Sequence, residues 1–312
     1  MAYKKVRNIS FYDLKLDPGT LVKTIDKFSN EIALALRARA KPFIRTIPSE
    51  GIVRLEVVDE APQKINFFSE VSKLEKMAGG LPMWLGSAVD GGDIWIDAAK
   101  NPHTLIAGTT GSGKTTLLHT MIANSLRNNT AVYLIDTKNI EFSAYTNKIN
   151  NLVMANTYID ALNMLKFLFL EMESRYASMR KSMSNEGVKK PPSSLLFIID
   201  EFADLIMQDD NNQFAGLLCR LAQKCRASNI HCVLATQRPS SDIISGSVKA
   251  NFPARIACQV ASGIDSKVVL DCSGAERLSG NGDAIIKNYN NDYVRFQVAY
   301  SSPEEVIANY AA

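Results

Sequence analysis

A glycine-rich segment at residues 108–115 contains the residue types that bind phosphate groups. It runs Gly-Thr-Thr-Gly-Ser-Gly-Lys-Thr, which fits G-x-x-x-x-G-K followed by Ser or Thr, between an apolar stretch and a helical pattern. Glycines let backbone N–H groups turn toward one anion, and the following helix points its positive end there. We expect Lys114 to neutralise the β- and γ-phosphates and the Thr115 hydroxyl to bind Mg²⁺. The residues expected to contact the nucleotide are Thr110, Gly111, Ser112, Gly113, Lys114, Thr115 and Thr116.

Two adjacent carboxylates follow a second apolar stretch at residues 195–199. Ligands of open α/β sheets bind at the carboxyl ends of the strands, where this stretch places Asp200 and Glu201. We expect Asp200 to hold Mg²⁺ through water and Glu201 to act as the general base on the attacking water. The base favours hydrolysis of ATP over transfer to a metabolite, and no NKxD segment for guanine is found. An isolated Asp-Glu pair is usually a solvated strand end, but the phosphate-loop pattern favours the catalytic interpretation.

A third apolar stretch ends in Ala-Thr-Gln-Arg-Pro at residues 235–239. An amide at the tip of the strand next to the carboxylate strand can sense whether the γ-phosphate is present. Gln237 is the candidate for this sensor, although glutamine is also common at ordinary strand ends.

Short apolar runs alternate with helical patterns from about residue 77 onward. Unbroken apolar strands separated by helices are typical of a parallel sheet covered on both faces. The expected strands are 104–107, 131–135, 152–155, 195–199, 232–235 and 256–260, with a further strand near 294–299. The expected helices include 157–183, a core helix near 214–225 and a short helix at 303–310. The pattern predicts an α/β fold with a mostly parallel sheet.

The first part of the chain has a different pattern, typical of a small α+β unit. Alternating apolar residues predict strands near 12–16 and 53–57, and Asp17-Pro18-Gly19 predicts a turn. A spacing of three and four predicts one amphipathic helix, with an apolar face made of Leu21, Ile25, Phe28, Ile32 and Leu36. We place a boundary near residue 76, which gives a small domain at 1–76 and a second domain at 77–312.

Composition sets limits on the class of protein. The 312 residues are 46% hydrophobic and 21% charged, which excludes a disordered or fibrous chain. A net charge of +3 is too small to indicate a nucleic-acid partner by itself. The five cysteines contain no C-x-x-C pair, which argues against a disulfide framework or a zinc site and favours buried thiols in a reducing compartment. There is no apolar run long enough to cross a bilayer and no secretory signal at the N-terminus, so a cytoplasmic location is expected.

Five segments, in this order, resemble the motor domain of the FtsK/SpoIIIE DNA translocases. They are HTLIAGTTGSGKTTLL, LIDTKNIEF, LLFIIDEFADL, AQKCRASNIHCVLATQRPSSDIISGSVKANFPARIA and SGAERLSGNGDAII. Residues 12–60 also resemble the small domain that precedes this motor. The resemblance implies a RecA-like P-loop ATPase core that assembles as a hexameric ring around double-stranded DNA, with ATP and Mg²⁺ as cofactors.

The resemblance also implies roles for single residues. Lys114 and Thr115 would bind nucleotide and metal, Asp200 and Glu201 would carry out hydrolysis, and Gln237 would sense the phosphate. Asp136, Lys138 and Glu141 match the segment D-P/T-K-x-x-E beside the site. Arg255, in PARIA, corresponds to an arginine that reaches the neighbouring subunit's site, where such a group is worth about 10³–10⁵ in rate. The alternative for Arg255 is a solvated residue at the start of a strand.

The sequence also departs from the family's pattern. The membrane spans, long linker and C-terminal winged-helix domain of the cell-division members are not found, and Asp265-Ser266-Lys267 replaces Asp-Ser-Arg. Lysine keeps the charge but loses bidentate geometry. These departures disfavour a septum-bound chromosome motor. We expect a compact motor from a mobile element, plasmid or phage, or a segment of a larger chain.

A motor that follows a duplex regardless of sequence should contact phosphates through basic side chains. Lys267, Arg277 and Lys287 are the DNA-contact candidates, and ordinary surface charge is the alternative for each. Lys189-Lys190 is better explained as solvated loop charge. The same motor would serve conjugative DNA transfer or phage genome packaging. A different class, a P-loop ATPase ring that moves protein or acts as an assembly scaffold, is the less favoured alternative.

Overall fold

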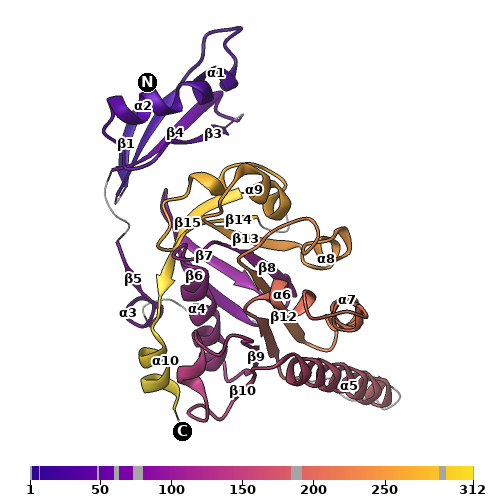
Figure 1. Cartoon of the computed structure of the whole chain (residues 1–312). Helices are drawn as coiled ribbons and strands as arrows, with labels where there is room; N and C mark the ends of the chain where they lie inside the picture. Colours follow the sequence, from indigo (N-terminus) through magenta and orange to yellow (C-terminus); the bar gives the residue numbers. More distant parts are fainter. Residues whose placement is uncertain are drawn as a thin grey trace.

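A computed structural model of the chain describes residues 2–6, 8–47, 49–59, 63–72, 80–183, 192–287 and 293–311. Its strands form a four-stranded sheet near the N-terminus and a separate sheet of eleven strands (Figure 1). The larger sheet is covered by helices on both faces, as the unbroken apolar runs predicted. None of the described helices combines the length and apolar character that a bilayer crossing requires.

The small sheet is antiparallel, with the order β1-β2-β4-β3. Its strands are β1 (Ala2–Val6), β2 (Ile9–Leu14), β3 (Phe43–Ile47) and β4 (Ile52–Val58). Two short helices, α1 (Val22–Lys27) and α2 (Ser29–Ala35), connect β2 to β3.

The expected single helix across residues 21–36 is wrong, because the chain leaves helical geometry at Phe28, where ψ is 14°. The predicted apolar face is also buried only in part: Leu21 and Phe28 are 67% and 55% exposed, and Ile25 and Ile32 are half-buried. Since helices in proteins gain most of their stability from burying such a face, two short helices replace one long one here.

Six neighbouring strands of the large sheet are parallel, in the order β10-β9-β11-β12-β8-β13. They are β8 (His103–Ala107), β9 (Ala131–Ile135), β10 (Leu152–Ala155), β11 (Leu195–Ile199), β12 (Ile230–Thr236) and β13 (Ala254–Cys258). The predicted strands are confirmed, except that β13 begins and ends two residues before the expected run. The mostly parallel α/β core is therefore the one that the sequence predicted.

Antiparallel strands extend this sheet beyond β13, in the order β14-β15-β6-β7, and β5 pairs with β15. Their bounds are β5 (Ile65–Asn66), β6 (Pro82–Ala88), β7 (Asp93–Asp97), β14 (Asp283–Lys287) and β15 (Tyr293–Tyr300). Only β15 was expected. The turn between β6 and β7 contains Gly91 and Gly92, both with positive φ, so the Gly-Gly pair marks a hairpin.

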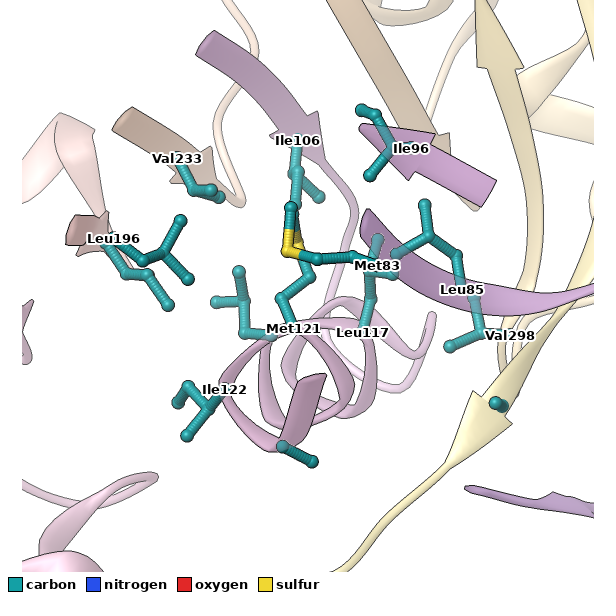
Figure 2. Packing of buried hydrophobic residues seen from close by; sticks show 14 of the residues in the cluster. Met83, Leu85, Ile96, Ile106, Leu117, Met121, Ile122, Leu196, Val233 and Val298 are labelled. Carbon is teal, nitrogen blue, oxygen red and sulfur yellow. The ribbon is translucent and has the colours of Figure 1, made fainter. Parts of the chain in front are cut away.

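Successive residues of a buried strand point to opposite faces of the sheet, which explains the continuous apolar runs. In β11, Leu196 and Ile198 pack on one face, while Leu195, Phe197 and Ile199 pack on the other. Helix α4 (Lys114–Arg127) fills the first face, with Leu117, Met121 and Ile122 against β6, β8, β11, β12 and β15 (Figure 2). The phosphate-loop helix is therefore the centre of one hydrophobic core.

Five helices cover the second face, and two more lie beside α4 or β15. The five are α5 (Tyr158–Met183), α6 (Phe202–Ile206), α7 (Gln213–Lys224), α8 (Gly246–Asn251) and α9 (Gly263–Leu270). The others are α3 (Phe67–Val71) and α10 (Pro303–Tyr310), and short 3₁₀ turns span Ser143–Tyr145 and Ala275–Arg277.

The predicted boundary near residue 76 falls in residues 73–79, which lie outside the described ones, and the two-domain division stays a prediction. The described segment just before it already packs with the large sheet. Strand β5 pairs with β15, and Phe67 and Val71 of α3 are buried in the α4 core.

A buried ion cluster joins the two sheets. Arg295 of β15 donates to both oxygens of Asp283, at 2.9 and 2.7 Å, and to Glu56 of β4 at 3.0 Å. All three side chains are almost completely buried. Burial raises the pKa of Glu56, against the opposing effect of Arg295. Removing the cation would leave buried carboxylates without a partner.

We expect Arg295→Met to lower the free energy of unfolding by about 3–5 kcal/mol, because it breaks a buried charge cluster by removing one partner. Arg277→Met is the matched control. Arg277 also pairs across the two sheets, with Asp26, but Asp26 is half-exposed, so a loss of about 1 kcal/mol or less is expected. Urea unfolding followed by circular dichroism measures both. Equal losses for the two variants would contradict the role of the buried cluster.

Two buried histidines make stability depend on pH. Burial lowers the pKa of His119 and of His231 from 6.5 to about 4. Between these values the unfolded chain binds protons that the folded chain does not. The free energy of unfolding should therefore fall as the pH drops from 6.5 to 4, by about 1.4 kcal/mol per pH unit for each histidine.

His119→Gln should remove one of these two contributions, so its unfolding free energy should fall less steeply than that of the wild type over the same pH range. Urea titrations at a series of pH values give the comparison. Parallel curves for the two proteins would mean that His119 does not titrate differently on unfolding.

Candidate nucleotide-binding site

The glycine-rich segment connects β8 to α4, and Lys114 is the first residue of the helix. Gly111 and Gly113 have φ of 78° and 100°, values that favour glycine. A Cβ atom at Gly113 would lie 2.3 Å from the backbone nitrogen of Gly282. Gly113 therefore allows a second part of the chain to approach the loop closely.

That second part is the segment Gly280-Asn281-Gly282, which supports the loop. The backbone N–H of Asn281 donates to the Gly111 carbonyl at 3.1 Å, and that of Gly282 donates to the Ser112 carbonyl at 2.9 Å. Asn281 also lines the nucleotide cavity. Residue types and spacing had predicted no role for this segment. The Gly-x-Gly pattern of this segment could have predicted a tight turn, since all three residues have positive φ.

Lys114 and Asp200 form a buried ion pair at the end of β11. The Lys114 Nζ donates to Asp200 Oδ1 at 2.6 Å and to the Asp200 carbonyl at 2.8 Å, and both side chains are 3% exposed. The structure thus brings the two predicted charges into direct contact. The Thr115 hydroxyl and the Asp200 carboxylate are hard oxygen donors of the kind that Mg²⁺ prefers, so this pair of residues fits a magnesium ion.

Glu201 is buried and held by the end of the neighbouring strand, β12. Its carboxylate accepts from the Thr236 hydroxyl at 2.6 Å and from the Gln237 backbone N–H at 2.9 Å. These donors fix the orientation of the carboxylate, as a general base requires. Thr236 was not among the predicted site residues, although it directly precedes the predicted sensor, Gln237.

The Gln237 side chain points to the phosphate loop, where its Oε1 accepts from the Thr110 hydroxyl at 3.1 Å. Glu201, Gln237 and the loop therefore form one connected group. The loop, Gln237 and Asn281 line a cavity of about 300 Å³ that also includes Glu141. Of the predicted nucleotide contacts, Ser112 does not line the cavity and is completely buried.

The segment after β9 is brought to the same region. Asp136 is buried and accepts from the backbone N–H groups of Asn139 and Phe142, which closes a turn. Lys138 pairs with Asp204 at 3.6 Å. Of the three residues matched here by resemblance, Glu141 is the one that lines the cavity.

Arg255 lies away from the phosphate loop of its own chain. It pairs in register with Leu105, in the middle of β8, whereas the loop follows the end of β8, and Arg255 does not line the nucleotide cavity. Its guanidinium donates to Asp271 at 2.5 Å. Lys287, predicted as a DNA contact, binds the same carboxylate at 2.7 Å. The structure therefore joins two residues for which the sequence analysis expected separate roles.

The other two DNA-contact candidates lie apart from Lys287. Lys267 is exposed on α9, and none of the ion pairs among the described residues includes it. Arg277 pairs with Asp26 of α1, between the small sheet and the larger one. Lys189-Lys190 lies outside the described residues.

Three residues distant in sequence form a buried group whose ligand atoms lie within 4.8 Å of one another: His103, Cys225 and Cys232. Spacing alone did not reveal it. However, His103 Nδ1 accepts from the Cys232 backbone N–H at 3.1 Å, and Nε2 lies 2.9 Å from the Ala222 carbonyl, to which it donates. Both ring nitrogens are therefore used, which favours buried thiols over a metal site.

Comparisons with known proteins agree with this geometry. The model of the FtsK/SpoIIIE family matches residues 68–190 and 181–241. The DNA translocase FtsK of Haemophilus influenzae is 34% identical over 341 residues, which is 96% of this chain and 64% of that protein. The DNA translocase FtsK of Chlamydia trachomatis is 33% identical over 326 residues, 96% of this chain and 41% of that protein. The chain spans 36% to 64% of the length of such relatives.

Solved structures share the fold at lower identity. The pCW3 conjugation coupling protein TcpA, a monomer form with ATPγS, gives a TM-score of 0.68 at 22% identity and covers 99% of this chain and 92% of its own. The cytoplasmic domain of the Thermomonospora curvata type VII secretion ATPase EccC gives 0.66 at 21% identity, over 80% of this chain and 34% of its own.

We expect Glu201→Gln to bind nucleotide normally but to lose about 10²–10⁴-fold in the rate of ATP hydrolysis, because the amide keeps the shape but not the basicity. Asp204→Asn, three residues along the chain and partly exposed, is the matched control and should keep the rate. Phosphate release and binding of a fluorescent ATP analogue measure the two steps. A Glu201→Gln protein with undiminished turnover would exclude Glu201 as the base.

Proposed function

This chain belongs to the FtsK/SpoIIIE family, and we propose that it is an ATPase that works as a ring-shaped, hexameric motor on double-stranded DNA. The observation that carries the proposal of ATP hydrolysis is the convergence of Lys114, Asp200, Glu201 and Gln237 on one phosphate loop. We further propose that residues 77–312 form the body of the motor and that residues 1–76 contain a small accessory domain, followed by β5 and α3, which pack with the motor's sheet. We also propose that the protein works in the cytoplasm.

Nucleotide binding requires a rearrangement of charge in the site. Lys114, which neutralises Asp200 in the structure, turns to the β- and γ-phosphates, and Asp200 becomes free to hold a cation. Thr115 and Asp200 are the residues that would hold Mg²⁺, which offsets phosphate charge when it is bound. The Lys114 ammonium group is thus paired with Asp200 before the nucleotide binds and with the phosphates after it binds.

Hydrolysis then depends on the group formed by Glu201, Thr236 and Gln237. The Glu201 carboxylate takes a proton from water as the water attacks the γ-phosphate. Its hydrogen bonds to β12 connect that event to Gln237, and Gln237 contacts Thr110 of the phosphate loop. Loss of the γ-phosphate would therefore change contacts on two elements at once, which is what a mechanical cycle needs.

Double-stranded DNA as the partner and the ring as the working form are supported by membership of the family and by the DNA translocases to which the chain is similar. The same motor would serve chromosome movement, conjugative transfer or genome packaging. A ring that moves protein would have the same ATP site, and its hydrolysis would respond to protein instead of DNA.

We expect linear duplex DNA to stimulate ATP hydrolysis several-fold and the binding of duplex to weaken steeply as salt rises, because several phosphates are neutralised per ring. Heparin serves as the control for charge alone, and the Lys114→Ala protein as the control for contaminating ATPase. Displacement of a triplex-forming strand from the duplex tests movement. Equal hydrolysis with and without duplex would contradict the proposal.

A further inference from the structure

One carboxylate on the motor is paired with three cations. Asp271 lies 2.6 Å from the Nζ of Lys249, 2.5 Å from a guanidinium nitrogen of Arg255 and 2.7 Å from the Nζ of Lys287. Among the described residues, Asp271 is the carboxylate in every ion pair of these three groups. The cluster therefore has an excess of two positive charges.

Two of the cations are placed together by the sheet itself. Arg255 of β13 and Lys287 of β14 are directly opposite each other in the antiparallel pairing of these strands. Like charges directly opposite each other destabilise a strand pair. An anion bound between them removes that penalty, and Asp271 supplies only one negative charge.

The cluster is built rather than loosely collected. The Arg255 guanidinium also donates to the carbonyls of Lys249, Phe252 and Val269 at 3.3 to 3.4 Å, at the ends of α8 and α9. Arg255 and Lys287 are mostly buried, with side chains 12% and 10% exposed. Arg255 and Lys287 are therefore held in place by the fold.

Asp271 is the most exposed member, with 42% of its side chain accessible. It ends α9 with a left-handed backbone at φ 66°. Although partial burial opposes the effect, the cations hold the pKa of Asp271 well below its usual range. The carboxylate is thus a permanent anion in a position from which it can turn to water.

The cluster is separate from the nucleotide cavity of its own chain. None of its four residues lines that cavity, and Arg255 pairs in register with Leu105 in the middle of β8, whereas the phosphate loop follows the end of that strand. A ligand of this cluster must therefore come from outside the chain or from another copy of it. A closed ring offers both, since its contacts join two different faces of each subunit.

We propose that Lys249, Arg255 and Lys287 form a single binding site for a phosphate group, and that Asp271 occupies it as an internal counter-ion until the phosphate displaces it. Three convergent cations, two of them held in place by the fold, suit a phosphate oxyanion. The inference rests on the proposed function for the source of the phosphate: the duplex backbone or the nucleotide held by the adjacent subunit.

The test compares two variants that change the net charge of the cluster in opposite directions. Asp271→Asn removes the competing charge and keeps the backbone, because asparagine also adopts left-handed geometry. The double variant Lys249→Gln/Lys287→Gln removes two of the cations. Lys166→Gln, an exposed lysine on α5, is the control for charge loss elsewhere. Urea unfolding checks that each variant is folded.

Binding of a labelled linear duplex by the full chain with ATPγS is measured by fluorescence anisotropy over a range of salt. If the phosphate belongs to DNA, Asp271→Asn binds the duplex several-fold more tightly and the double variant more weakly. The slope of log affinity against log salt should become shallower by about 1 for each lysine that no longer neutralises a phosphate.

If the phosphate belongs to the adjacent subunit's nucleotide, the salt slopes match the wild type. ATP hydrolysis without DNA then falls in the double variant and rises in Asp271→Asn. Effects of the same sign in both variants, or no effect on either measurement, would overturn the site. If the site is overturned but ATP hydrolysis by the wild type still responds to duplex DNA, the proposed function stands. If hydrolysis by the wild type does not respond to duplex DNA, the proposed function is refuted. The site is then tested by the hydrolysis rates of the variants without DNA.

Discussion

The buried contact between Lys114 and Asp200 is the interaction around which the site is organised. Both charges are almost fully removed from water, and either one alone would be strongly unfavourable there. The pair is possible because β8 and β11 run parallel in one sheet and end at the same edge, with β12 between them. A triphosphate can enter only by giving Lys114 a new anion and leaving Asp200 with a cation. The exchange of partners is therefore a requirement of electrostatics as well as a step in catalysis.

Prediction from sequence worked best where the constraint was local or periodic. The apolar runs gave the six parallel strands because both faces of these strands are buried, and the glycine pattern gave the phosphate loop. The N-terminal helix was predicted wrongly because its periodicity is real but its face, including Leu21 and Phe28, remains largely exposed in this chain. The antiparallel strands β6, β7 and β14 were missed, although β6 and β7 form a local hairpin around Gly91 and Gly92 and β14 pairs with the next strand, β15.

The same distinction applies to the site. Lys114, Asp200, Glu201 and Gln237 sit at strand ends, so parallel topology alone brings them together. The support given by Asn281 and Gly282, and the shared carboxylate of Arg255 and Lys287, depend on chain segments that meet only in the folded molecule. The spacing of residues along the sequence does not reveal such tertiary contacts. Roles assigned one residue at a time therefore separated two cations that form one group.

Three ion clusters in this chain differ in their balance of charge, and the balance indicates what each one needs. At Lys114 one cation meets one carboxylate, so the pair is complete until a ligand replaces a partner. At Arg295 one cation meets two buried carboxylates, and Arg45 is a second cation that opposes the rise in the pKa of Glu56, so the chain itself supplies charge that offsets the second carboxylate. At Asp271 three cations meet one carboxylate, and no proton can correct an excess of positive charge on arginine and lysine near neutral pH. Of these three clusters, the one at Asp271 requires an anion from outside, and its position outside the nucleotide cavity lets a second molecule supply it.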